Sequence, residues 1–407
     1  MSPEPELEPE AQKRLDDLVA GFEEDMRQRP TPMELGEEEG GDTRPPAARR
    51  KRPTKAKPAA AEIAAQAELA AKAPAQPPAK APAQPSAEAP NAPEPAPVDT
   101  VFPALSPRPE AAPLPYGDIQ SWWSRGERIP VEVTGPSNAA VTREIFVRVV
   151  GDGPWLTLVH GFPTSSYDWA PMMEPLSKKY RLLMFDLLGF GDSDKPSGHD
   201  WSAFEQADIV ESLWRHHRVD STRILAHDVG DTVTLELLAR SGEGKLAAKV
   251  SGITFLNGGI YTGFHRPRPI QVWLQRPVIG ALIARMLSES RFGPALAEIF
   301  GPEHQPTPEE LHQHWLSVAR RNGGRNYHRL IRYIAERRAN AVRWETALEA
   351  TDIPLRFVWG MADPVSGAHM AEVIRERRQG ANIIELADVG HYPQLEAPEQ
   401  VARAVLS

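Results

Sequence analysis

An aspartate at a sharp turn is the feature of this sequence that most directly predicts chemistry. Asp228 stands between an apolar run and a helical pattern, with the small residues Ala226 and Gly230 two positions before and after it. A strand-to-helix turn that exposes a nucleophile needs this spacing, because larger side chains would collide where the chain reverses. A carboxylate displaces at an sp3 carbon and forms an alkyl ester, so Asp228 predicts epoxide opening or halide displacement. The simpler alternative is a buried aspartate that accepts backbone hydrogen bonds in the turn.

Two residues farther along the chain are further candidates for catalysis. Asp363 follows an apolar run, and His391 lies on a loop ahead of the last helical pattern. Taken singly, they are typical of a helix N-cap and of a solvated histidine. Together with Asp228 they follow the chain order nucleophile, acid, base of a hydrolase triad. Because Asp228 is already ionised, we expect His391 to deprotonate the water that hydrolyses the alkyl ester. We expect Asp363 to orient the histidine and stabilise its imidazolium form.

A third segment predicts an oxyanion site. His160-Gly161-Phe162-Pro163 stands at the end of another apolar run, where Gly161 lets the backbone approach a neighbouring site. The Phe162 amide and the amide of Val229, the residue after the candidate nucleophile, are then expected to hold a developing oxyanion. An ordinary β-turn is the alternative for this segment.

The elements that would position these residues alternate in type. Two alternating runs predict an antiparallel pair, and six short apolar runs predict buried strands separated by helices, which is typical of a mostly parallel sheet covered on both faces. The predicted strands are 128–133, 144–150, 155–159, 181–185, 223–226, 250–256, 355–359 and 383–386, with helices over 203–217 and 232–240. Residues 258–350 show only helical patterns with many aromatic side chains. We predict that they form a cap inserted over the carboxyl ends of the strands, where such sheets bind ligands.

Composition divides the chain into two regions. Residues 1–115 are rich in Ala, Pro, Glu and Lys and predict a disordered tail, whereas residues 116–407 have the size of one α/β domain with an insertion. A basic run at 49–57 leaves open that the tail binds an unknown partner. The net charge of −9 provides no basic field for nucleic acid, so no nucleic acid is expected on the folded domain.

The remaining composition bears on location and cofactors. The sequence contains no cysteine, which excludes disulfides and cysteine metal ligands and fits a reducing compartment. Its N-terminus is acidic and broken by proline, unlike a secretory signal, and no apolar run reaches the ~20 residues needed to span a bilayer. We therefore expect a cytoplasmic protein without a transmembrane segment, and a reaction that uses neither a cofactor nor a metal.

The motifs taken together resemble those of the epoxide hydrolase-like group of the α/β-hydrolase superfamily, over residues 119–407. The segments that carry the resemblance are 160–169, 189–196, 227–231, 257–260 and 391–396. The resemblance implies the α/β-hydrolase fold and a helical cap. It also implies a cap tyrosine that protonates the opened ring oxygen, and Tyr333 stands in the matching segment, which continues through Arg337 and Trp344. A second cap tyrosine has no clear match, although Tyr261 and Tyr327 are candidates.

Two other functions remain open at this stage. Haloalkane dehalogenases carry tryptophan after the nucleophile, where this chain has Val229, and often asparagine where it has Phe162. Fluoroacetate-type dehalogenases carry arginine at the Val229 position. A non-catalytic binding scaffold is the alternative from another class. We expect an epoxide hydrolase-like enzyme acting on a small apolar substrate, which the aromatic cap favours.

Overall fold

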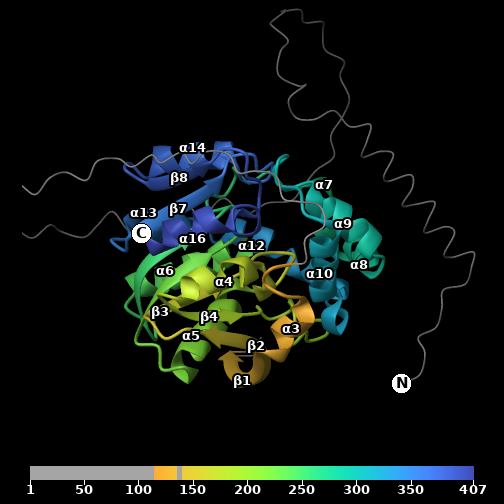
Figure 1. The fold of residues 1–407 in the computed structure, drawn as a ribbon, viewed down its shortest axis with the longest axis horizontal. Helices are drawn as coiled ribbons and strands as arrows, with labels where there is room; N and C mark the ends of the chain where they lie inside the picture. Colours follow the sequence, from red (N-terminus) through yellow and green to blue (C-terminus); the bar gives the residue numbers. More distant parts are fainter. Residues whose placement is uncertain (1–113, 135–139) are drawn as a thin grey trace, which may run out of the picture. The chain divides into compact units, whose positions relative to one another are not determined.

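The computed structural model describes residues 114–134 and 140–407 (Figure 1). The predicted tail, residues 1–115, lies outside the described residues except for its last two positions. No described helix is both long enough and apolar enough to cross a membrane.

An eight-stranded sheet forms the centre of the described fold. Its spatial order is β1-β2-β4-β3-β5-β6-β7-β8, with antiparallel pairing of β1 with β2 and of β2 with β4, and parallel pairing elsewhere. The strands are β1 (Glu127–Thr134), β2 (Ala140–Val150), β3 (Trp155–Val159), β4 (Arg181–Phe185), β5 (Ser221–Ala226), β6 (Lys249–Phe255), β7 (Leu355–Gly360) and β8 (Asn382–Leu386). The predicted α/β-hydrolase fold is confirmed, and each predicted strand corresponds to one of these, although β6 ends at Phe255, one residue before the predicted end.

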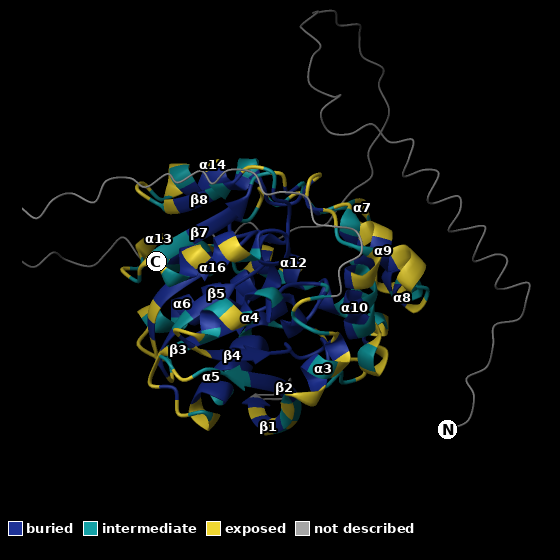
Figure 2. Cartoon of the chain, viewed as in Figure 1, coloured by how far each residue is buried: buried dark blue, intermediate teal, exposed yellow. Residues whose placement is uncertain are grey.

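Helices cover both faces of this sheet because successive strand residues point to opposite sides. Leu183 and Phe185 of β4 join one hydrophobic cluster, whereas Leu182 and Met184 join another. The first cluster includes residues of α5 (Ala203–His216), α6 (Val229–Gly242) and α14 (Ala368–Arg377). The second includes residues of α3 (Ile119–Ser124), α4 (Ala170–Ser177) and α16 (Pro398–Leu406). Figure 2 shows the strands buried between helices whose outer faces are exposed.

The chain between β6 and β7 forms helices joined by loops and contains no strand, as the sequence predicts. It contains α7 (Pro269–Leu274), α8 (Pro277–Arg285), α9 (Glu289–Ala297), α10 (Pro308–Ala319), the 3-10 helix η3 (Arg320–Asn326), α11 (Tyr327–Leu330), α12 (Tyr333–Ala339) and α13 (Ala341–Ala350). We call this segment the insertion. Short helices η2 (Ser166–Trp169) and α15 (Pro393–Glu396) complete the described fold.

One boundary differs from prediction in a way that matters for the site. The sequence predicts that the helix after Asp228 begins at Thr232, but α6 begins at Val229, directly after the aspartate. The polar residues Asp231 and Thr232 hide the apolar pattern of this first turn. The chain therefore passes from strand to helix across only two residues.

A buried carboxylate joins the insertion to the sheet layer. Glu236 on α6 is 1% exposed and accepts hydrogen bonds from Trp344 Nε1 at 2.9 Å, Arg343 Nε at 2.8 Å and Arg240 Nε at 2.9 Å. Burial alone would raise the pKa of Glu236, but the hydrogen bonds from Arg343, Trp344 and Arg240 outweigh burial and lower it. Because the pKa is lowered on folding, this carboxylate stabilises the fold above its unfolded pKa and less as the pH falls.

We predict that Glu236→Gln lowers the free energy of unfolding by about 2–3 kcal/mol at pH 7, because two charged donors lose their carboxylate. Urea unfolding at pH 7 and at pH 4 measures this, and the difference from wild type should shrink at the lower pH. The matched control is Glu243→Gln, which removes another partner of Arg343 at the protein surface and should change stability little. Equal losses in both variants would contradict the assignment.

Candidate active site

The turn at Asp228 is held in a conformation that few residues adopt. Asp228 has φ 50° and ψ −107° and lies between β5 and α6. A Cβ on Gly230 would collide with the carbonyl oxygen of Val159 on the neighbouring β3, so glycine is required there. Such strain persists only where the surroundings enforce it, and it occurs often at functional sites. The spacing of small residues thus has the structural role that the sequence predicts.

The Asp228 carboxylate is buried, at 3% exposed, and two of the predicted residues contact it. The Phe162 amide donates to Asp228 Oδ2 at 3.0 Å, and the Tyr333 hydroxyl of α12 donates to Oδ1 at 3.4 Å. The described residues include no hydrogen bond from the Val229 amide to this carboxylate. Val229 is nevertheless the first residue of α6, where backbone amides lack helical acceptors.

The other two predicted residues form a hydrogen-bonded pair. His391 Nδ1 lies 2.8 Å from Asp363 Oδ2, which leaves Nε2 as the ring nitrogen for proton transfer. Asp363 also accepts from the Val365 amide at 2.7 Å and from the Ser366 hydroxyl at 2.7 Å. These donors fix the orientation of the carboxylate and hence the tautomer of the histidine.

An asparagine that the sequence analysis gave no role joins the nucleophile turn to this pair. Asn257 donates from side-chain Nδ2 to Asp363 Oδ2 at 3.0 Å, and its backbone carbonyl oxygen accepts from the Asp228 amide at 3.1 Å. Its side-chain oxygen also accepts from the Gly360 amide at 2.6 Å, and its Nδ2 donates to the Gly360 carbonyl at 2.8 Å. The feature of the sequence that could have indicated this role is the position of Asn257 at the end of a predicted strand, beside two glycines.

A second residue without a predicted role fixes the loop that carries His391. Glu396 accepts from the amides of Gly390, Tyr392 and Gly301 at 2.7, 2.9 and 2.8 Å. Burial raises the pKa of Glu396 to about 7, although these amides oppose the shift. Because Gly301 belongs to the insertion, the insertion and the histidine loop are held by the same carboxylate.

The charges of the site perturb one another. Burial lowers the pKa of His391, but the Asp363 carboxylate outweighs burial and, with Asp228, raises it to about 9. Burial raises the pKa of Asp363, but the charge and hydrogen bond of His391 bring it down to about 2. Burial and the charge of Asp228 raise the pKa of the Tyr333 hydroxyl well above its usual value. The charge of Asp228 therefore acts on both groups that would exchange protons with a substrate.

Neither alternative tyrosine contacts the Asp228 carboxylate in the described residues. The Tyr327 hydroxyl donates to the Pro163 carbonyl at 2.5 Å, and the Tyr261 hydroxyl is buried without a hydrogen-bond partner among the described residues. Of the three candidate tyrosines, Tyr333 is therefore the one whose hydroxyl reaches the Asp228 carboxylate.

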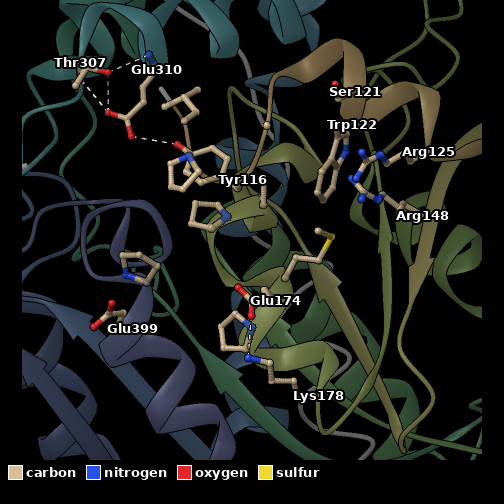
Figure 3. Close-up of a pocket in the computed structure, with 18 residues that line it drawn as sticks. Tyr116, Ser121, Trp122, Arg125, Arg148, Glu174, Lys178, Thr307, Glu310 and Glu399 are labelled. Atoms are coloured by element: carbon tan, nitrogen blue, oxygen red, sulfur yellow. Dashed lines mark hydrogen bonds and ion pairs between the residues drawn. The ribbon is translucent and has the colours of Figure 1, made fainter. Parts of the chain in front are cut away.

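A surface groove of about 910 Å³ lies apart from these residues (Figure 3). Trp122, Arg148, Glu174 and Lys178 are among its lining residues, and none of the predicted site residues lines it. The described residues contain no group of three or more His, Asp or Glu side chains arranged to hold a metal ion.

Comparison with known proteins identifies the class. Residues 158–404 match the alpha/beta hydrolase family. The chain therefore belongs to the α/β-hydrolase family, and the resemblance stated from the motifs is confirmed at that level.

Two relatives and one solved structure illustrate the similarity. LipZ of Mycobacterium tuberculosis strain H37Rv is 37% identical over 71% of this chain and 97% of LipZ. The mesoderm-specific transcript protein of Mus musculus, which the sequence motifs also resemble, is 39% identical over 62% of this chain and 77% of that protein. The structure of haloalkane dehalogenase DbeA from Bradyrhizobium elkani USDA94 covers 69% of this chain and 96% of its own, with a TM-score of 0.56 and 22% identity. This last likeness is one of fold.

We predict that Asp228→Asn lowers the pKa of His391, because it removes a negative charge that raises that pKa in the wild type. Nuclear magnetic resonance titration of the His391 ring in both proteins measures the shift. Asp352→Asn, at an exposed aspartate, is the control and should leave the titration unchanged. An unchanged His391 titration in Asp228→Asn would mean that the two groups are not coupled.

Proposed function

We propose that this protein is an epoxide hydrolase-like enzyme in which Asp228 is the nucleophile. The observation that carries the proposal is the buried Asp228 carboxylate at a strained turn, contacted by the Phe162 amide and by the Tyr333 hydroxyl. Serine at this position would favour acyl transfer, whereas a carboxylate favours attack on an sp3 carbon. A strained ring ether supplies such a carbon together with an oxygen that needs a proton.

In the first step, an oxygen of Asp228 attacks a ring carbon and the C–O bond of the epoxide breaks. The electron pair of that bond passes to the ring oxygen, which takes the proton of the Tyr333 hydroxyl. The product is an alkyl ester on Asp228 with a free hydroxyl group on the substrate. Trp201 and Phe162 lie against the Tyr333 ring, with ring centroids 6.0 and 6.1 Å away, and suit a small substrate with an apolar part.

In the second step, water hydrolyses the ester. Esterification removes the charge of Asp228, one of the charges that raise the pKa of His391, and the His391 ring then releases its proton through solvent to the Tyr333 oxygen and becomes available as a base. His391 then takes a proton from water as the hydroxide attacks the ester carbonyl carbon, and the Phe162 and Val229 amides stabilise the oxyanion. Collapse breaks the ester C–O bond, and the proton left on the oxygen that came from water passes to the departing alkoxide, which restores the Asp228 carboxylate and releases a diol. His391 keeps the proton taken from water, so both residues regain their starting states and the net reaction is epoxide plus water to diol.

Halide displacement is the alternative reaction. This reaction would pass through the same kind of ester intermediate. The similarity to a haloalkane dehalogenase structure, at 22% identity, is one of fold and does not indicate the substrate. Both haloalkane dehalogenases and epoxide hydrolases usually carry tryptophan where this chain has Val229, so that position does not separate the two reactions, whereas Tyr333 provides the proton that an epoxide oxygen needs. A binding scaffold has no use for the His391–Asp363 pair, so it ranks third.

We predict that His391→Gln protein accumulates an alkyl ester on Asp228, because ester formation needs no base and ester hydrolysis does. Intact-protein mass spectrometry after incubation with mixed epoxides and haloalkanes measures the adduct, with Asp228→Asn/His391→Gln as the control that cannot form it. A mass increase equal to a whole epoxide supports the proposal. An increase equal to an alkyl group without its halogen supports the dehalogenase instead. No adduct from a folded protein with either class would count against an alkylated aspartate.

We predict that Tyr333→Phe slows ring opening roughly 100-fold or more, the range lost with a general acid, but changes ester formation from a haloalkane much less, since a halide leaves without a proton. Rates of adduct formation in the His391→Gln background measure both. The matched control is Tyr327→Phe, whose hydroxyl bonds Pro163 instead of Asp228. Equal effects of Tyr333→Phe on both electrophiles would assign this tyrosine a packing role.

A further inference from the structure

A buried arginine beside the candidate nucleophile lacks an anionic partner. Arg337 on α12 is 3% exposed, and its Nε and Nη2 donate to Thr232 Oγ1 at 3.0 and 2.5 Å. Its Nη1 is shielded from solvent and has no hydrogen-bond partner among the described residues. The ion pairs formed within the described part of the chain do not include Arg337. A buried cation left without an anion is costly, so this guanidinium is suited to a ligand.

The contacts of Arg337 place its guanidinium beside the Tyr333 ring and against the first turns of α6. Its Cζ lies 5.2 Å from the ring centroid of Tyr333, whose hydroxyl reaches Asp228. Its hydrogen-bond acceptor Thr232 lies one helical turn after Asp228 on α6. The cation thus flanks the nucleophile from the side of the insertion.

The side chain of His265 lies close to the Arg337 guanidinium. A Cβ on Gly259 would collide with Arg337 Nη1 and would lie 3.2 Å from His265 Nδ1, so both nitrogens adjoin the same backbone position. Both ring nitrogens of His265 are shielded from solvent and unpaired within the described residues. Burial and the charge of Arg337 lower the pKa of His265 to about 3, so the ring is neutral and has one N–H to donate.

The buried carboxylate of Asp231, which follows the candidate nucleophile on α6, makes no ion pair with Arg337 among the described residues. Asp231 is fully buried beside Gly258, and both of its oxygens are unpaired in the described residues. Burial and the charge of Asp228 raise the pKa of Asp231 well above its usual value, although the charge of Arg337 opposes the shift. Arg337 Nη1 therefore remains without an anionic partner among the described residues.

We propose that Arg337 and His265 form a carboxylate-binding subsite, so that the substrate is an electrophile with an apolar part and a carboxylate near its reacting carbon. This inference rests on the proposed function, because it assumes attack by Asp228. A guanidinium with a free N–H and a neighbouring imidazole matches the paired oxygens of a carboxylate. The subsite also offsets the repulsion between such a substrate and the Asp228 carboxylate. When Asp228 loses its charge in the ester, the substrate carboxylate remains as the partner of Arg337.

The test compares charged and neutral epoxides of the same shape. Oxirane-2-carboxylate, and homologues with one to three methylene groups between ring and carboxylate, are each paired with the corresponding carboxamide. Rates of adduct formation are measured by intact mass in the His391→Gln background and in the same background with Arg337→Gln. For at least one homologue, the carboxylate-to-amide rate ratio should fall about tenfold or more in Arg337→Gln, as expected for a lost hydrogen bond to a charged group. Arg337→Lys should recover part of the ratio.

The control variant is Arg338→Gln, an exposed arginine next along α12, which should leave the ratio unchanged. If the amides alkylate Asp228 but no carboxylate-to-amide ratio responds to Arg337→Gln, the subsite is wrong and the proposed function stands. If no epoxide alkylates Asp228, the proposed function fails. Binding of pentanoate to the wild-type and Arg337→Gln proteins, measured by calorimetry on samples with matched circular dichroism, then tests the subsite separately. Equal pentanoate affinities would overturn it, and weaker binding to Arg337→Gln would support it.

Discussion

The strained turn at Asp228 is the constraint on which the rest of the site depends. A non-glycine residue with φ 50° costs about 1–3 kcal/mol, and it persists because three neighbouring strands fix its surroundings. The Asp228 amide donates to Asn257 after β6, Gly230 packs on β3, and β5 pairs with both of these strands. The turn brings the carboxylate within hydrogen-bond distance of the Phe162 amide, which follows β3. The sheet register is therefore part of the geometry of the proposed site, because a shift of one residue in either neighbouring strand would remove a contact of the Asp228 turn.

Charge balance links the proposed steps. Asp228, Asp363, His391 and Arg337 are all buried, so a change in the charge of one is felt by the others with little screening. The wild-type pKa of about 9 for His391 describes a state in which Asp228 is ionised and the base is protonated. Alkylation of Asp228 would remove one of the charges that raise the pKa of His391. In the proposed mechanism, the first step therefore makes His391 a better base for the second step.

The sequence predicted the parts of this protein that depend on local pattern. The strands, the nucleophile turn and the pair His391–Asp363 are each marked by apolar runs and by small or turn-forming residues close in the chain. Asn257, Glu396 and Arg337 were not predicted to have these roles, because each acts through partners far along the chain. Glu396 contacts the Gly301 amide, and Arg337 contacts Thr232, 105 positions away. Tyr333 was identified through the family resemblance, because nothing in the sequence around a tyrosine in a helix indicates which distant residue its hydroxyl will contact.

The insertion contributes to both chemistry and positioning. Its helix α12 brings Tyr333 to the nucleophile and Arg337 to the flank of the site, one turn apart on the same helix. Its loop after α9 holds the histidine segment, because the His391 amide donates to the Ile299 carbonyl at 2.8 Å and Gly301 shares Glu396 with that segment. In the proposed mechanism, segments that follow strands of the sheet supply the nucleophile, the acid and the base, whereas the insertion supplies the groups that would meet the leaving oxygen and the substituents of the substrate. Under that proposal, substitutions in the insertion would change substrate preference while the Asp228 turn and the His391–Asp363 pair stay as they are.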